Sequence, residues 1–233
     1  MKRKFIKKTV SVLLSVLLIL TLTLGISAHE IYYVTSGTQY VPIVLKWNVL
    51  LNGKAYLKVN ADGLNNEPYQ SPDYNYALYR EQFANVKYRW NNCENLVTVS
   101  SVSAGNANVI YTTSDIDIWL ALVGEDRWDD VLGTTRLYDS NGLYIDGPYY
   151  ASISSKKIVK AYIYMNPYIY DVFGTNTAKI RNTFVHETGH ALTLGHPNIS
   201  YAPQNVALVM LSGIYTYESP QDHDKGDIRA KYG

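Results

Sequence analysis

The sequence predicts an α+β fold, and three segments of the chain indicate it. Residues 157–166, KIVKAYIYMN, alternate apolar with more polar side chains, which is the period of a strand with one packed face. In residues 74–90 the apolar side chains instead recur at nearly helical spacing, and residues 177–194 carry a second stripe of this kind. One chain therefore combines strands with at least two long helices.

The earliest predicted element lies in residues 41–60, which are rich in β-branched and aromatic side chains. The turn signal Asn52-Gly53 within this stretch favours a strand or a hairpin. The helix of residues 74–90 follows, and it is expected to end at Asn91-Asn92.

Shorter elements are expected in the middle of the chain. Two short strands are predicted in residues 94–103 and 106–113. Residues 114–148 hold many acids and glycines and are predicted to be mainly loop, before the strand at 157–166.

The last long helix is predicted in residues 177–194 and includes a histidine-rich segment. Asn176 or Thr177 can cap its N-terminus, and its apolar stripe is expected to face the core. Gly195 and Pro197 are expected to end it. The stripe consists of Ile180, Phe184, Ala191 and Leu194.

The N-terminal residues 1–28 have the layout of a secretory signal peptide. Five basic residues precede an apolar run from Val10 to Gly25, and Ile26-Ser27-Ala28 form a small-residue exit. The run is short for a membrane span, which needs about 20 residues. We therefore expect a secreted, extracellular protein without stable membrane association, whose residues 29–233 form one domain.

Composition limits the partners of this domain. A formal net charge of +1 with 18% charged residues gives no electrostatic reason to expect nucleic acid. The single cysteine, Cys93, cannot form an internal disulfide, and a buried thiol is the favoured reading over an intermolecular link or a reactive group. The predicted state is a monomer.

The segment HETGHALTLGH, from His186 to His196, holds three of the five histidines. His186 and His190 are four residues apart and share one helix face, so both imidazoles can reach one zinc ion. His196 lies on another face, because six residues turn a helix by about 600°. The helix therefore has to end, and the chain to reverse, before His196 can become a third ligand.

Glu187 follows the first histidine and is offset from the metal-binding face. Zinc would lower the pKa of a bound water to about 7 and polarise a carbonyl. Glu187 would take the proton of this water and pass it to the leaving amine. The motif thus predicts a zinc endopeptidase with Glu187 as general base.

HETGHALTLGH resembles the metzincin signature HExxHxxGxxH, closest to the matrixin-like branch of secreted zinc endopeptidases. The sequence KIVKAYIYMN sits where that family has its edge strand, and VLGTTRLYDSNG resembles the loop before it. ALVMLSG would supply the family's methionine turn at Met210, and DIRAKYG is similar to the family's closing helix.

The resemblance implies a twisted, mostly parallel sheet over two long helices, followed by a small irregular C-terminal subdomain. Zinc would lie in a cleft between the two parts, above an apolar floor formed by Met210. A peptide or protein substrate would add as a strand alongside residues 161–166.

The chain departs from the signature at Thr193, where the family has glycine. That glycine takes a turn conformation which a β-branched residue disfavours. Either Thr193 is strained, or the helix runs two residues further and turns at Gly195.

The remaining residues limit which further metal ions can be expected. Only His29 and His223 lie outside the motif, so a second zinc is not expected. Asp139, Asn141 and Asp146 could place oxygens around calcium, although turn formation explains the same residues.

Two alternatives stay open. The chain could be a catalytically inactive metzincin-like extracellular binding module, made inactive by the change at Thr193. Alternatively, Glu218 or Asp222 could replace His196 as the third zinc ligand.

Overall fold

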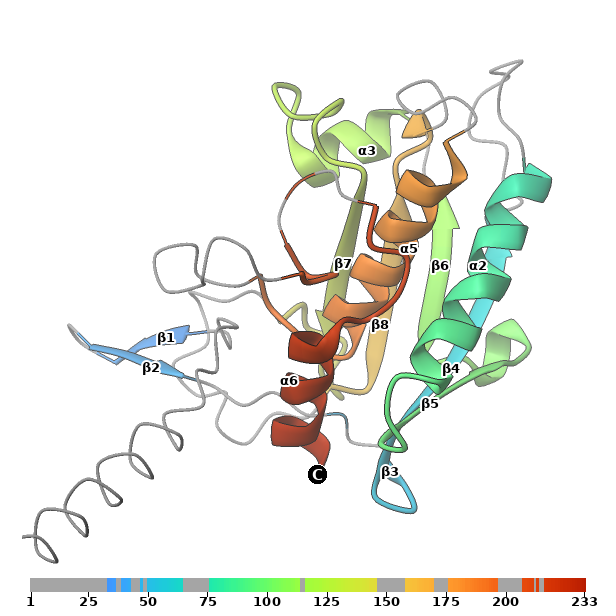
Figure 1. Ribbon diagram of the computed structural model, residues 1–233. Coiled ribbons are helices and arrows are strands. Elements are labelled where there is room, and N and C mark those ends of the chain that lie inside the picture. The colour runs from blue at the N-terminus through green and yellow to red at the C-terminus, as the bar shows by residue number, and fades with distance from the viewer. Residues whose placement is uncertain are drawn as a thin grey trace, which may run out of the picture.

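The chain folds into an α+β structure in which helices cover a mixed sheet (Figure 1). The computed structural model describes residues 33–36, 39–42, 47, 50–64, 76–113, 116–145, 158–169, 176–196, 207–211, 213 and 216–233. The elements are β1 (Tyr33–Ser36), β2 (Gln39–Pro42), β3 (Leu50–Leu51), β4 (Lys54–Gly63), α2 (Tyr76–Asn91), β5 (Val97–Ser101), the 3-10 turn η1 (Ala104–Asn106), β6 (Val109–Thr113), α3 (Ile116–Val123), β7 (Gly133–Tyr138), β8 (Lys160–Met165), α5 (Thr177–Ala191) and α6 (Asp222–Tyr232).

The main sheet is mixed and mostly parallel. Its strand order is β3-β4-β6-β8-β7, with β5 also paired to β4. β4 runs parallel to β5 and β6, and β6 runs parallel to β8. β3 and β7 are antiparallel to their neighbours. β1 and β2 form a separate antiparallel pair.

The predicted turn at Asn52-Gly53 joins β3 to β4. Its two residues have φ angles of 53° and 79°, which match a tight hairpin turn with two left-handed residues. This part of the prediction for residues 41–60 is confirmed.

The strand predicted at 157–166 forms β8, but its expected place at the sheet edge is wrong. Ala161, Ile163 and Met165 are buried, as the alternation predicted. However, β8 pairs with β6 on one side and with β7 on the other. The edge is taken by β7, part of the segment VLGTTRLYDSNG that was expected to be a loop.

Residues 114–148 hold two elements that the sequence pattern did not indicate. In α3 only Trp119 is fully buried, although almost every residue is apolar, so no amphipathic stripe marks the helix. In β7 only Leu137 is fully buried, so a period of two is not visible there either. The prediction of a mainly looped stretch is therefore wrong for these residues.

Helices α2 and α5 lie side by side on one face of the sheet (Figure 1). The ring of Tyr79 meets Phe184 edge to face, with centroids 5.9 Å apart. Trp90 and Val185 are both buried, and the indole Nε1 of Trp90 donates to the carbonyl of Val185 at 3.1 Å. These contacts fix α5, which carries the motif, against α2.

The predicted signal peptide, residues 1–28, lies outside the described residues. Among the helices that are described, none is both long and apolar enough to cross a membrane. Cys93 is free and buried, which confirms the favoured interpretation of this thiol.

Candidate metal centre and cleft

Helix α5 presents His186 and His190 on one face. Its N-terminus is capped by Asn176, whose side chain accepts from the backbone N–H of Lys179 at 3.3 Å. One helical turn separates the two histidines, and their Nε2 atoms lie 3.0 Å apart. This part of the site follows from helix geometry alone.

Helix α5 ends at Ala191 with Leu192 as its C-cap, and the chain turns at Thr193 and not at Gly195. The N–H of Leu194 donates to the carbonyl of Gly189 at 3.0 Å, and the N–H of Thr193 donates to His190 at 2.8 Å. This pair of bonds is the Schellman arrangement, which needs a left-handed residue directly after the C-cap. Thr193 is that residue, with φ of 67°.

The first of the two alternatives for Thr193 is therefore the one observed. A left-handed conformation costs a residue with a Cβ roughly 1–2 kcal/mol. Gly195, for which this conformation would be free, is not among the described residues with positive φ. The expectation that Gly195 and Pro197 end the helix is wrong.

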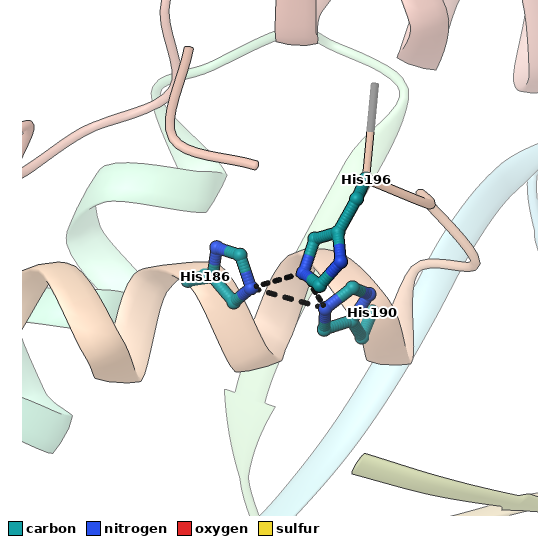
Figure 2. A group of neighbouring side chains, drawn as sticks. All are labelled: His186, His190 and His196. Atoms are coloured by element: carbon teal, nitrogen blue, oxygen red, sulfur yellow. Dashed lines mark hydrogen bonds between the residues drawn. The ribbon is translucent and has the colours of Figure 1, made fainter. Parts of the chain in front are cut away.

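The turn brings His196 back to the other two histidines (Figure 2). Its Nε2 atom lies 3.0 Å from Nε2 of His186 and 3.1 Å from Nε2 of His190. These separations are shorter than twice the usual Zn–N distance of about 2.0–2.1 Å, so one ion can reach all three nitrogens. Within the described residues, these three form the one cluster suited to holding a metal.

The opposite ring nitrogens indicate which atoms are free to bind a metal. His186 Nδ1 lies 2.8 Å from the carbonyl of Val209, and His190 Nδ1 lies 2.8 Å from that of Leu194. A carbonyl only accepts, so each neutral ring carries its proton on Nδ1 and a lone pair on Nε2. Two lone pairs 3.0 Å apart repel each other unless a cation lies between them. The donor set thus fits a metal ion.

The protonation state of His186 agrees with this arrangement. Burial lowers the pKa of His186 to about 4, and the nearby His196 acts in the same direction, while the Val209 carbonyl opposes both. The ring is therefore neutral near pH 7, which is the form that binds metals.

Glu187 lies beside the histidines and is held by β7. Its Oε2 atom accepts from the hydroxyl of Thr135 at 2.7 Å, and its backbone carbonyl lies 3.0 Å from the same hydroxyl. A Cβ on Gly133 would come within 2.7 Å of Glu187 Cγ, so only glycine lets the strand approach this closely. Burial raises the pKa of Glu187 to about 7, and the Thr135 bond opposes the rise.

Met210 lies beneath the helix that carries the ligands. A Cβ added to Gly189 would lie 2.2 Å from Met210 Sδ, so the methionine packs directly on the α5 backbone. The carboxylate of Asp224, on α6, accepts from the N–H of Val209 at 2.9 Å. Because Val209 also orients His186, α6 supports the metal site through this turn.

A cleft with a volume of about 370 Å³ opens beside the histidines and Glu187. One wall is formed by the end of α3 and the loop after it, including Arg127 and Asp130. The other is formed by residues 132–135 of β7 and its approach. The cleft thus joins the predicted ligands to the edge strand of the sheet.

The alternative third ligands lie elsewhere in the structure. Glu218 accepts from Arg181, and Asp222 pairs with Lys225 at 2.9 Å. Asp139, from the calcium prediction, accepts from the N–H groups of Asn141 and Leu143 and so closes a turn. Asp146 lies outside the described residues, so the calcium site stays a prediction.

Several supporting residues were missed from the sequence. Thr135, Gly133, Asp224 and Lys231 contact the motif or its turns from distant parts of the chain. Threonine in place of the motif glycine was the one sequence signal for such residues. A strained turn at this position implies that other residues hold it in place.

Comparison with known proteins adds no assignment, because the sequence matches no protein-family model and no curated protein.

Proposed function

We propose that the protein is a secreted zinc-dependent endopeptidase of the metzincin type. The observation that carries the proposal is the convergence of His186, His190 and His196 on one point, with Glu187 beside them in a cleft. Zinc fits better than calcium or magnesium, because three imidazole nitrogens are typical zinc ligands and those ions prefer oxygen.

The three histidines, which line the cleft, would hold the ion through Nε2. When bound, zinc supplies a Lewis acid that polarises the scissile carbonyl and acidifies a water molecule. Glu187 would accept a proton from the attacking water and would donate it to the leaving nitrogen. Thr135 keeps the carboxylate of Glu187 in place during both transfers, since its hydroxyl donates to Oε2.

The substrate would bind as an extended peptide along β7. Among the described strands, β7 pairs only with β8 over residues 133–136, and its residues 133–135 line the cleft. An unpaired edge offers backbone N–H and C=O groups to a peptide strand. This location replaces the one expected next to β8.

Zinc content and peptide cleavage test the proposal together. Wild-type protein should bind one zinc per chain and cleave peptides, and a chelator should remove both properties. Glu187→Gln should keep the zinc while the cleavage rate falls by at least about 100-fold, because a general base contributes this much. Glu218→Gln, outside the cleft, should retain both properties.

The inactive binding module remains the alternative function, and the same measurements separate the two. A purified protein that takes up no zinc, or one whose Glu187→Gln variant cleaves as fast as wild type, would contradict the endopeptidase. His196→Ala should weaken zinc binding strongly. Unchanged affinity in this variant would favour an acidic third ligand instead.

A further inference from the structure

We propose that Lys231 is a positioning residue of the metal site, which holds the left-handed turn at Thr193 and thereby sets His190 and His196. The inference rests on the proposed zinc binding, but Lys231 itself lies outside the motif and is not among the residues that line the cleft. It gives a role to a buried lysine that the proposed peptide cleavage does not use.

The turn at Thr193 needs support from outside the helix. Its φ of 67° lies in the left-handed region, where a β-branched side chain is disfavoured. Strained backbone of this kind persists only where surrounding contacts determine it. The two Schellman bonds, to His190 and Gly189, come from within the turn and would form equally with glycine at this position.

Helix α6 supplies contacts that are specific to this turn. Nζ of Lys231 donates both to the carbonyl and to the hydroxyl of Thr193. The next residue, Tyr232, donates its hydroxyl to the carbonyl of Leu192 at 3.0 Å. Lys231 and Thr193 are both buried, with 7% and 1% of their surface exposed. Two neighbouring residues of α6, Lys231 and Tyr232, thus hydrogen-bond to two neighbouring residues of the turn.

The same turn determines two of the three metal ligands. The carbonyl of Leu194, directly after Thr193, lies 2.8 Å from Nδ1 of His190 and fixes the orientation of that ring. His196 lies two residues further, and its Nε2 comes within 3.1 Å of that of His190. A change in the turn would therefore move one ligand and rotate the other. Partners of this kind typically change metal affinity by about 10- to 100-fold.

Zinc affinity of the full chain, measured by competition with a chromophoric chelator, tests this role. Lys231→Met, which keeps the length of the side chain but not the donor, should weaken zinc binding by about 10- to 100-fold. Lys225→Met is the matched control, because Lys225 also lies on α6 but pairs with the exposed Asp222. The control should bind zinc like wild type.

A second pair of variants separates the positioning role from general loss of stability. Glycine adopts the left-handed conformation without strain. Thr193→Gly should therefore make Lys231 dispensable, and the Thr193→Gly/Lys231→Met double variant should recover most of the lost affinity. Circular dichroism and thermal unfolding of the metal-free proteins report folding independently of zinc.

Two outcomes would overturn the inference. One is zinc affinity that is unchanged in Lys231→Met. The other is a double variant that binds about tenfold or more weaker than Thr193→Gly alone, a comparison that holds even if Lys231→Met itself does not fold. Wild-type protein that binds no zinc would instead contradict the proposed function.

Discussion

Two glycines show how closely the site is packed at the level of single residues. Gly133 lets β7 approach Glu187, and Gly189 lets Met210 approach the α5 backbone. A Cβ at either position would fall well inside the normal contact distance of the neighbouring side chain. Glycine is therefore required at both positions for lack of space, since neither has a positive φ.

Gly133→Ala should lower kcat while zinc binding is kept. The new Cβ would push Glu187 away from its place, and a displacement of about 1 Å can cost about 100-fold in rate. Gly105→Ala is the control, because a Cβ there meets nothing within 4 Å. Steady-state kinetics of both variants, with zinc content measured in parallel, decides the outcome. Equal activity of Gly133→Ala and wild type would show that Glu187 does not depend on this contact.

Gly189→Ala should destabilise the protein, although alanine is the better helix former. The overlap with Met210 is expected to cost about 1–3 kcal/mol, as for other overpacked cores. Gly226→Ala provides the contrast in α6, because a Cβ there would come no closer than 3.9 Å to the flexible end of the Arg229 side chain. That change should stabilise the protein by about 0.5–1 kcal/mol. Opposite shifts of the denaturant midpoint are expected, and shifts of the same sign would contradict the packing argument.

At the level of elements, the position of β7 sets the place where the proposed peptide substrate would bind. The strand separates β8 from the cleft and offers its own edge at residues 133–135. Hydrogen bonds of a strand pair involve only every second residue of each strand. A substrate held in this way should therefore be sensitive at alternate positions.

N-methylation of a cleaved peptide, one residue at a time, tests binding along β7. Methyl groups at alternate positions near the scissile bond should raise KM strongly, and those between them should have little effect. The methyl group removes a donor and blocks close approach of the strands. Uniform tolerance of N-methylation would exclude strand pairing as the mode of recognition.

The elements with a strong period were predicted correctly, and those without one were missed. Burial on one face gives α5 and β8 their patterns, so both were found close to their observed limits. α3 is apolar on most sides, and β7 has a single fully buried residue, so neither carries a period. Missing β7 also caused the error about the edge of the sheet.

At the level of the whole molecule, the site gathers residues from most of the chain. Trp47 Nε1 donates to the carbonyl of Ala191 across 144 positions, and Thr135 reaches Glu187 across 52. The grouping of the three histidines was predictable, because they lie within eleven residues of one helix and its turn. Their supports were not, because they depend on tertiary contacts that leave no local pattern.

The reactivity of the buried thiol of Cys93 reports whether the folded protein opens locally around this residue. Burial, followed by repulsion from Glu94, raises the pKa of this thiol from 9.0 to about 12. The reactive thiolate should therefore remain scarce in the folded protein between pH 7 and pH 9, where an ordinary cysteine becomes reactive. Alkylation of native protein at pH 7 should be about 1,000-fold slower than in denaturant, because a pKa of about 12 in place of 9.0 lowers the thiolate fraction by that factor. Native protein that is labelled as fast as the denatured protein would show that this region opens.

The pairing of Thr193 with Lys231 has a consequence for how such proteins evolve. A threonine in the left-handed turn is tolerable only where a donor such as Lys231 holds it, whereas glycine needs no such partner. The two positions should therefore change together: lineages with glycine at the turn are free to lose the lysine, and lineages that gain threonine must first possess it.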